Sequence, residues 1–153
     1  WAGLRQRRGK GGLAIGGLAL VAASAAAAVL LPAVSASAVS TLGGEAFSEA
    51  RLATLRAGGR PVFVYFTADW CLTCKVNERA AIDRAETRAA FAKAHVATLV
   101  GDWTRGDPAI GRFLTAQGRA GVPLYLYYRP KAATPEVLPQ VLTPGMLAAL
   151  TVS

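Results

Sequence analysis

The sequence of 153 residues has few of the residues that hold small disulfide-rich or metal-bound domains together. It contains two cysteines and one histidine. Two cysteines cannot staple a miniprotein through several disulfides, and they cannot form a four-cysteine zinc site. A hydrophobic share of 53% excludes a disordered chain. We therefore expect one ordinary folded domain with an appendage, and we expect neither a metal nor a cofactor.

Acidic residues are missing from the first 44 positions, which hold four of the 17 basic residues. The other 13 basic residues and all nine acidic ones fall in residues 45–153, a balance of +4 out of the total of +8. No stripe of clustered Lys and Arg accompanies that small excess, so nucleic acid is not an expected partner. The chain opens at Trp1 rather than at a methionine, and we interpret it as a fragment or a processed product.

Charged residues are also absent from a long stretch after the basic cluster. Within it, residues 13–34 form a run of 22 positions dense in Ala, Leu, Val, Ile and Gly, enough to cross a hydrocarbon core of about 30 Å as a helix. By the positive-inside rule, residues 1–12 are expected to be a cytoplasmic basic flank. Residues 35–44 are then a linker, and residues 45–153 form an extracytoplasmic domain.

Two other interpretations of residues 13–34 remain open. A basic start, an apolar stretch and Ala36-Ser37-Ala38 fit the outline of a cleaved signal peptide, although the stretch exceeds the usual apolar region of about 7–15 residues. The run could instead be a buried helix of a soluble protein. The membrane anchor and the signal peptide agree that residues 45–153 are exported.

The exported part alternates short β-rich runs with helical patterns, which predicts an α/β fold with a mixed central sheet flanked by helices. Strands are predicted at residues 61–67, 95–102 and 122–128, with an edge strand at 137–142. Helices are predicted at residues 45–55, 71–94 with a break near 82–83, 107–117 and 143–150. The loop that follows the first strand lies where such folds place their chemistry.

Cys71-Leu72-Thr73-Cys74 occupies that strand-to-helix loop. Two cysteines at this spacing in the first turn of a helix lie on one face, within disulfide reach. The first sulfur lies at the helix N-terminus, where free backbone N–H groups and the helix dipole favour a thiolate. The pattern predicts a redox-active pair in which Cys71 attacks a disulfide and Cys74 resolves the mixed disulfide.

Two less reactive uses of the pair are open, half of a zinc site and a structural disulfide. His95 alone cannot complete a zinc site, and a four-residue disulfide loop restrains little of the unfolded chain.

Val122-Pro123 is a second unusual feature, because proline is disfavoured within a strand. It is either a trans edge proline or a cis peptide that packs beside the cysteines and presents backbone to a substrate.

Residues 66–75, Phe-Thr-Ala-Asp-Trp-Cys-Leu-Thr-Cys-Lys, and residues 118–123, Gly-Arg-Ala-Gly-Val-Pro, resemble the thioredoxin superfamily. With Asp102-Trp103-Thr104 and the continuation through Glu78, they resemble more closely the C-terminal periplasmic domain of the DsbD family of protein-disulfide reductases. The upstream apolar run resembles the last transmembrane helix before that domain. The resemblance implies a thioredoxin-like fold preceded by one transmembrane helix, a redox-active Cys71–Cys74 disulfide and a cis peptide at Pro123.

In such proteins a cysteine-bearing membrane domain passes electrons to this C-terminal domain, which reduces periplasmic partners. The resemblance therefore implies a protein-disulfide reductase of the inner membrane. Its implied partners are a transmembrane electron-donor domain, upstream in the same protein, and extracytoplasmic proteins that contain disulfides. Two alternatives stay open: a stand-alone tethered thioredoxin-like protein for cytochrome c maturation, and a non-catalytic binding module, against which the intact Cys71 and Cys74 argue.

One position departs from the family pattern, because Tyr65 stands where members carry a buried Asp six residues before the first cysteine. How the proton of Cys74 is handled without that acid is left open. Glu78, four residues after Cys74, matches an acid of the family near the site and is the expected substitute; otherwise it is a solvated helix acid. Trp70 is a candidate docking residue or a partly buried aromatic. Asp69 is expected to hold the loop through an Asx turn or a cap, with a role in catalysis as the alternative.

Overall fold

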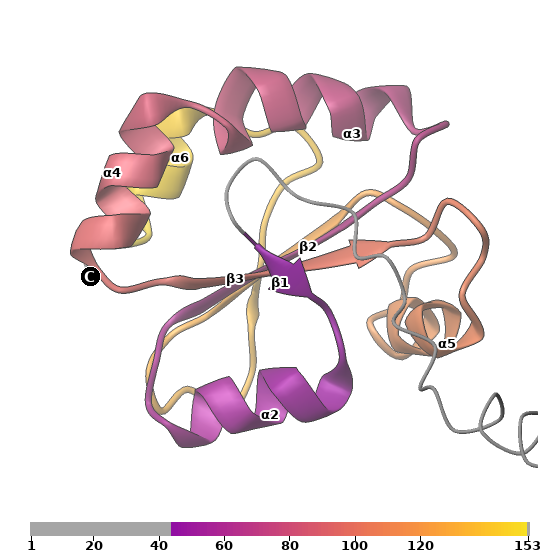
Figure 1. The fold of residues 1–153 in the computed structure, drawn as a ribbon, viewed down its shortest axis with the longest axis horizontal. Helices are drawn as coiled ribbons and strands as arrows, with labels where there is room; N and C mark the ends of the chain where they lie inside the picture. Colours follow the sequence, from indigo (N-terminus) through magenta and orange to yellow (C-terminus); the bar gives the residue numbers. More distant parts are fainter. Residues whose placement is uncertain (1–43, 153) are drawn as a thin grey trace, which may run out of the picture. The chain divides into compact units, whose positions relative to one another are not determined.

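The structure is a computed structural model that describes residues 44–152, drawn as a ribbon in Figure 1. A five-stranded sheet in the order β1-β3-β2-β4-β5 forms its centre. The strands are β1 (Glu45–Ala46), β2 (Val62–Thr67), β3 (Ala97–Asp102), β4 (Leu124–Tyr128) and β5 (Glu136–Val137). The helices are α2 (Glu49–Ala57), α3 (Leu72–Asn77), the π-helix η2 (Glu78–Ile82), α4 (Ala85–Lys93), α5 (Pro108–Ala116) and α6 (Pro144–Ala149).

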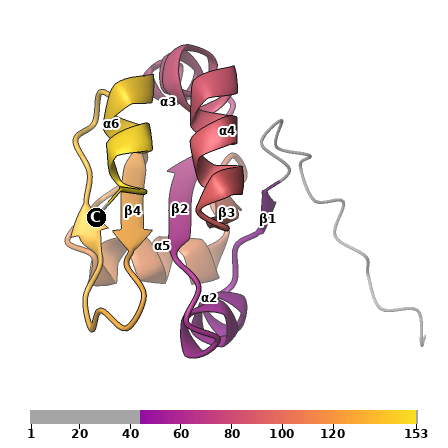
Figure 2. The same cartoon turned by 90° about the vertical axis from the view of Figure 1, so that its left-hand side faces the viewer.

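The sheet is mixed, as the sequence predicted. Strands β1, β3 and β2 run parallel, whereas β4 pairs antiparallel with β2, and β5 pairs antiparallel with β4. Helices α2 and α5 lie on one side of the sheet, and α3, α4 and α6 lie on the other (Figures 1 and 2). The described part of the chain is therefore an α/β sandwich with a helical layer on each face.

Strand β2 is the buried centre of this sandwich. Val64 and Phe66 pack into the cluster that holds the apolar side chains of α2 and α5. Phe63 and Tyr65 pack into the opposite cluster, with residues of η2, α4 and α6. Because both faces of β2 are covered, its sequence is hydrophobic from Val62 to Phe66 instead of alternating with polar residues. This burial fixes the position of its carboxyl end, where the cysteine loop begins.

Gly101 allows a close approach between β2 and β3. It stands opposite Phe66 in the sheet register. A Cβ atom added at Gly101 would lie 2.2 Å from the Phe66 ring, a distance that no real contact allows. The Phe66 ring, which also stacks near Phe113 of α5, therefore needs glycine at this position.

The first predicted helix, residues 45–55, was wrong at its start. Residues 45–46 form the short edge strand β1, which pairs with Leu99 and Val100, and helix α2 begins only at Glu49. The reason is local, because the Ser48 side chain accepts a hydrogen bond from the Arg51 N–H and caps the helix there. The remaining helices confirm the prediction, including the break in residues 71–94, which falls between η2 and α4.

The predicted strand at 137–142 was too long. Only Glu136–Val137 pairs with β4, although it lies at the edge of the sheet as expected.

No helix within residues 44–152 is both long and apolar enough to cross a membrane. The predicted basic flank at 1–12, the span at 13–34 and nearly all of the linker at 35–44 lie outside the described residues.

Candidate active site

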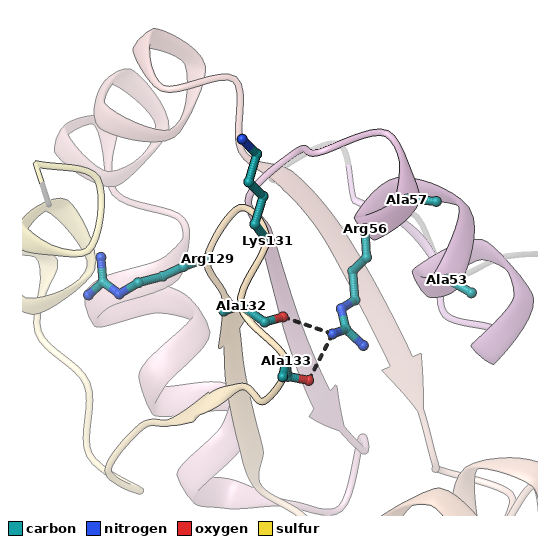
Figure 3. A pocket seen from close by; sticks show the side chains of 7 residues that line it. All are labelled: Ala53, Arg56, Ala57, Arg129, Lys131, Ala132 and Ala133. Carbon is teal, nitrogen blue, oxygen red and sulfur yellow. Dashed lines mark hydrogen bonds between the residues drawn. The ribbon is translucent and has the colours of Figure 1, made fainter.

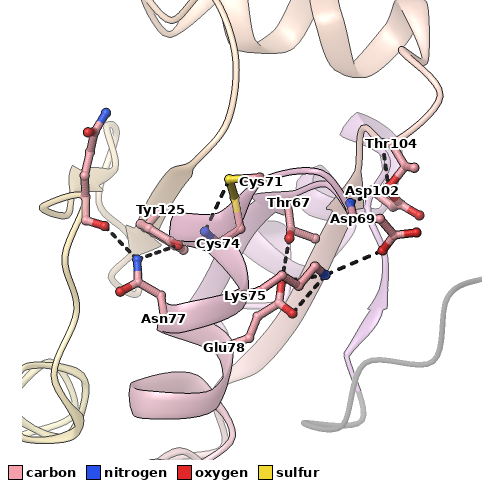
Figure 4. Close-up of a disulfide and its surroundings, with 11 residues drawn as sticks. Thr67, Asp69, Cys71, Cys74, Lys75, Asn77, Glu78, Asp102, Thr104 and Tyr125 are labelled. Carbon is pink, nitrogen blue, oxygen red and sulfur yellow. Dashed lines mark hydrogen bonds and ion pairs between the residues drawn. A yellow bond between two sulfur atoms is a disulfide. The ribbon is translucent and has the colours of Figure 1, made fainter.

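The two cysteines lie just beyond the carboxyl end of β2, at the first turn of α3 (Figure 4). Cys71 and Cys74 form a disulfide, with their Cα atoms 5.2 Å apart. The backbone N–H of Cys71 donates to the Ala68 carbonyl at 3.0 Å, which closes the loop between strand and helix. The structure thus brings the pair together as the spacing predicted.

Cys71 itself is the N-cap of α3. Its Sγ accepts a hydrogen bond from the Cys74 backbone N–H at 3.2 Å, and its carbonyl accepts from Lys75 N–H. Of the two roles expected for Asp69, the cap of α3 is therefore wrong, because Cys71 occupies the capping position. A backbone N–H aimed at Sγ, together with the positive end of the helix dipole, would stabilise a thiolate at Cys71 after reduction.

Both cysteines are largely enclosed. Cys71 is 7% exposed and Cys74 is 1% exposed, so Cys71 is the more accessible of the two sulfur-bearing residues. Ala68 and Val122 pack against them. The Val122–Pro123 peptide bond is cis, as the resemblance implied, and Val122 places it beside the disulfide.

Glu78 lies at the junction of α3 and η2 and takes part in a polar cluster next to the cysteines. Its carboxylate accepts a hydrogen bond from the Thr67 hydroxyl at 2.5 Å and pairs with Lys75 Nζ at 3.0 Å. Lys75 also lies 3.7 Å from the Asp69 carboxylate. With its side chain 18% exposed, Glu78 is a partly buried acid and not the fully solvated one that was the alternative.

Asn77 is a buried polar residue that the sequence analysis missed. Its side-chain amide donates to the Tyr125 hydroxyl at 2.8 Å and to the Gln140 carbonyl at 2.6 Å, and its Oδ1 accepts from Leu142 N–H. The residue therefore ties the cysteine helix to β4 and to the segment before α6. Burial raises the pKa of Tyr125 to about 12, although the hydrogen bond from Asn77 acts in the opposite direction.

Three exposed apolar side chains lie close in sequence to the pair. Trp70 is 60% exposed, Leu72 78% and Val76 54%. The Trp70 ring lies 6.2 Å from the partly buried ring of Trp103, centroid to centroid. Trp70 is thus on the surface next to Cys71 in the sequence, which is a position that a docking residue could use and that a packed core aromatic would not have.

A pocket of about 460 Å³ lies between α2 and the segment after β4 (Figure 3). It is remote from the cysteines, because Tyr128 at the end of β4 pairs with Val62 at the start of β2. The Arg56 guanidinium donates hydrogen bonds to the carbonyls of Ala132 and Ala133. The Lys131 side chain points away from the Arg56 guanidinium. Among the described residues that line this pocket, no unpaired cations point toward one common place. Nor do residues 44–152 hold a group of three or more potential metal ligands.

The fold and the cysteine pair define a thioredoxin-like domain with the means for thiol-disulfide exchange. Residues 45–130 match the thioredoxin-like family, and the chain belongs to it.

Among individual proteins, the chain is 32% identical over 82 residues to the thiol:disulfide interchange protein DsbD 1 of Pseudomonas aeruginosa. That match covers 54% of this chain and 14% of the relative's length. The oxidised C-terminal domain of DsbD from Neisseria meningitidis has a similar structure, with a TM-score of 0.57 and 21% identity over 70% of this chain and 95% of that one. A thioredoxin from Thermus thermophilus gives a TM-score of 0.54 with 18% identity, over 71% and 88% of the two chains.

Proposed function

We propose that the chain is a membrane-tethered protein-disulfide reductase that passes electrons through Cys71 and Cys74 to extracytoplasmic proteins. The observation that carries the proposal is the capping geometry of Cys71, whose sulfur receives the Cys74 N–H at the start of α3. A purely structural disulfide would not need its first sulfur at a helix N-terminus, between the exposed apolar residues Trp70 and Leu72 in the sequence. The likeness to DsbD supports the reductase assignment.

The exchange takes two steps, and each step breaks one disulfide bond and forms another. In the reduced chain, the Cys71 thiolate attacks one sulfur of a partner disulfide, and the other partner sulfur leaves as a thiolate. Cys74 then loses its proton and attacks the Cys71 sulfur, which restores the Cys71–Cys74 disulfide and releases the second partner thiolate. Two electrons pass to the partner. A dithiol donor returns the chain to the reduced form by the same steps in reverse, and we place that donor in a cysteine-bearing membrane domain.

The tether is residues 13–34, with residues 1–12 on the cytoplasmic side. The support is the uncharged apolar run and the basic cluster that precedes it. The domain that follows would then work on the periplasmic side, where protein disulfides persist. Electrons taken from a membrane donor would reach proteins that no cytoplasmic reductant can reach.

The direction of electron flow can be tested by the reduction potential of the pair. The chain would be equilibrated with glutathione buffers of known ratio, and the dithiol fraction measured by alkylation and mass spectrometry. A reductase should have a potential close to that of thioredoxin, about −270 mV. A value close to the strongly oxidising DsbA, about −120 mV, would reverse the proposed direction while leaving the exchange chemistry intact.

A further inference from the structure

We propose that Thr104 is a positioning residue that holds Trp70 and the segment before Cys71 in place for contact with a protein disulfide. The proposal rests on the function proposed above and assigns a part of the site to a residue outside the cysteine loop. Thr104 follows β3, 30 or more positions along the chain from the residues that it holds.

Two groups of Thr104 reach the cysteine loop. Its hydroxyl oxygen accepts a hydrogen bond from the Asp69 backbone N–H at 3.0 Å. Its carbonyl accepts from the indole Nε1–H of Trp70 at 3.2 Å. One residue therefore fixes both the backbone that leads into Cys71 and the ring that lies beside it.

Thr104 is itself held in one orientation by Asp102. The Asp102 carboxylate accepts from the Thr104 backbone N–H at 2.9 Å and from its hydroxyl at 2.5 Å (Figure 4). A hydroxyl has a single O–H to donate. Because that hydrogen is directed to Asp102, a lone pair of the oxygen is left to accept from Asp69. The carboxylate thus sets the direction in which the threonine acts.

The exposed position of Trp70 explains how the hydrogen bonds of Thr104 could assist the binding of a partner protein. The ring is 60% exposed, and a free side chain of that size would sample several orientations. A ring already fixed at the surface loses less freedom when a partner packs on it. A large partner that covers the loop would contact Trp70, whereas a small disulfide that reaches only the Cys71 sulfur need not. Thr104 should therefore matter for protein disulfides and much less for small ones.

The test compares Thr104→Val, which keeps the shape but loses the hydroxyl, with Thr104→Ser, which keeps the hydroxyl. Thr54→Val is the matched control, because its hydroxyl bonds only the Ala50 carbonyl on the exposed side of α2. The full chain, reduced and in detergent, would be mixed with insulin or with a small aromatic disulfide. Thr104→Val removes both hydrogen bonds of the hydroxyl, with Asp69 and with Asp102, and so frees the carbonyl that binds Trp70 to shift. The variant should lower the insulin rate about threefold to tenfold and the small-disulfide rate by less than about twofold.

Thr104→Ser should restore the insulin rate, and Thr54→Val should leave it unchanged. Amide exchange gives a readout that does not depend on activity, since the Asp69 N–H should exchange faster in Thr104→Val and at the wild-type rate in Thr104→Ser. An unchanged insulin rate in Thr104→Val, or an equal loss for both disulfides, would overturn the proposal and leave the proposed function standing. A wild-type chain as inert as Cys71→Ser toward both disulfides would overturn the function, and the role of Thr104 with it.

Discussion

Replacing Glu78 by glutamine should lower the pKa of the Cys74 thiol. The carboxylate follows Cys74 by four residues, and a negative charge at that place disfavours a second one on the sulfur. The structure supports such coupling because the Glu78 side chain is only 18% exposed and is fixed by Thr67 and Lys75. Glu78 would then take the part of the acid that the family carries at the position of Tyr65.

The magnitude follows from the spacing. Side chains four residues apart on a helix lie about 6 Å apart, where two unit charges interact by about 3 kcal/mol at an effective dielectric constant of about 20. That energy corresponds to about two pKa units. The Lys75 ammonium at 3.0 Å and the partial exposure of the Glu78 carboxylate both weaken this coupling, so we expect the pKa of Cys74 to fall by less than that upper limit.

The assay is a titration of the reduced chain, followed by thiolate absorbance and by the alkylation rate of each cysteine. The opposite change, Lys75→Gln, removes the cation that pairs with Glu78 at 3.0 Å and should raise the pKa of Cys74 by a similar amount. Glu86→Gln is the matched control, an exposed acid in the first turn of α4. Superimposable curves for wild type, Glu78→Gln and Lys75→Gln would refute the coupling and leave water as the route for the Cys74 proton.

Three further predictions concern the tether, the cysteines and the sheet. A reporter fused after Ser153 should be active only in an assay for export, and cytoplasmic activity would contradict a span at residues 13–34. In the reduced chain, alkylation at mild pH should modify Cys71 before Cys74, and Cys74→Ser should accumulate mixed disulfides through Cys71; labelling in the reverse order would exchange the two roles. Burial raises the pKa of Tyr125 to about 12, so the folded state holds that proton more tightly than the unfolded state. The free energy of unfolding should therefore fall by about 2 kcal/mol as pH rises from about 10 to 12, and Tyr125→Phe should flatten that part of the curve.

The sequence was sufficient to locate the central strand and the cysteine pair. The run from Val62 to Phe66 is continuously hydrophobic because helices cover both faces of β2, and such a run is a strong local signal. Cys71 and Cys74 follow it directly, so their place at a strand-to-helix junction needed no long-range information.

Contacts between distant segments could not be predicted in the same way. The hydrogen bond from Asp69 to Thr104 joins residues 35 positions apart, and no periodicity or spacing in the sequence signals it. Likewise, nothing in the sequence distinguishes Asn77 from an exposed polar residue of a helix. Only the folded structure shows that it is buried against Tyr125. The two-residue strand β1 was misassigned because a strand that short shows no alternation of apolar and polar residues. The helical pattern of the residues after it is longer and was extended over β1.

The central claim is that Cys71 and Cys74 carry electrons to protein disulfides, and insulin reduction tests it most directly. The full chain would be supplied with dithiothreitol, and the turbidity of the released insulin chains followed over time. The wild type should speed reduction well above the dithiothreitol background, whereas Cys71→Ser should return it to that background. A Cys71→Ser chain that reduces insulin at the wild-type rate, or a wild type no faster than dithiothreitol alone, would contradict the claim.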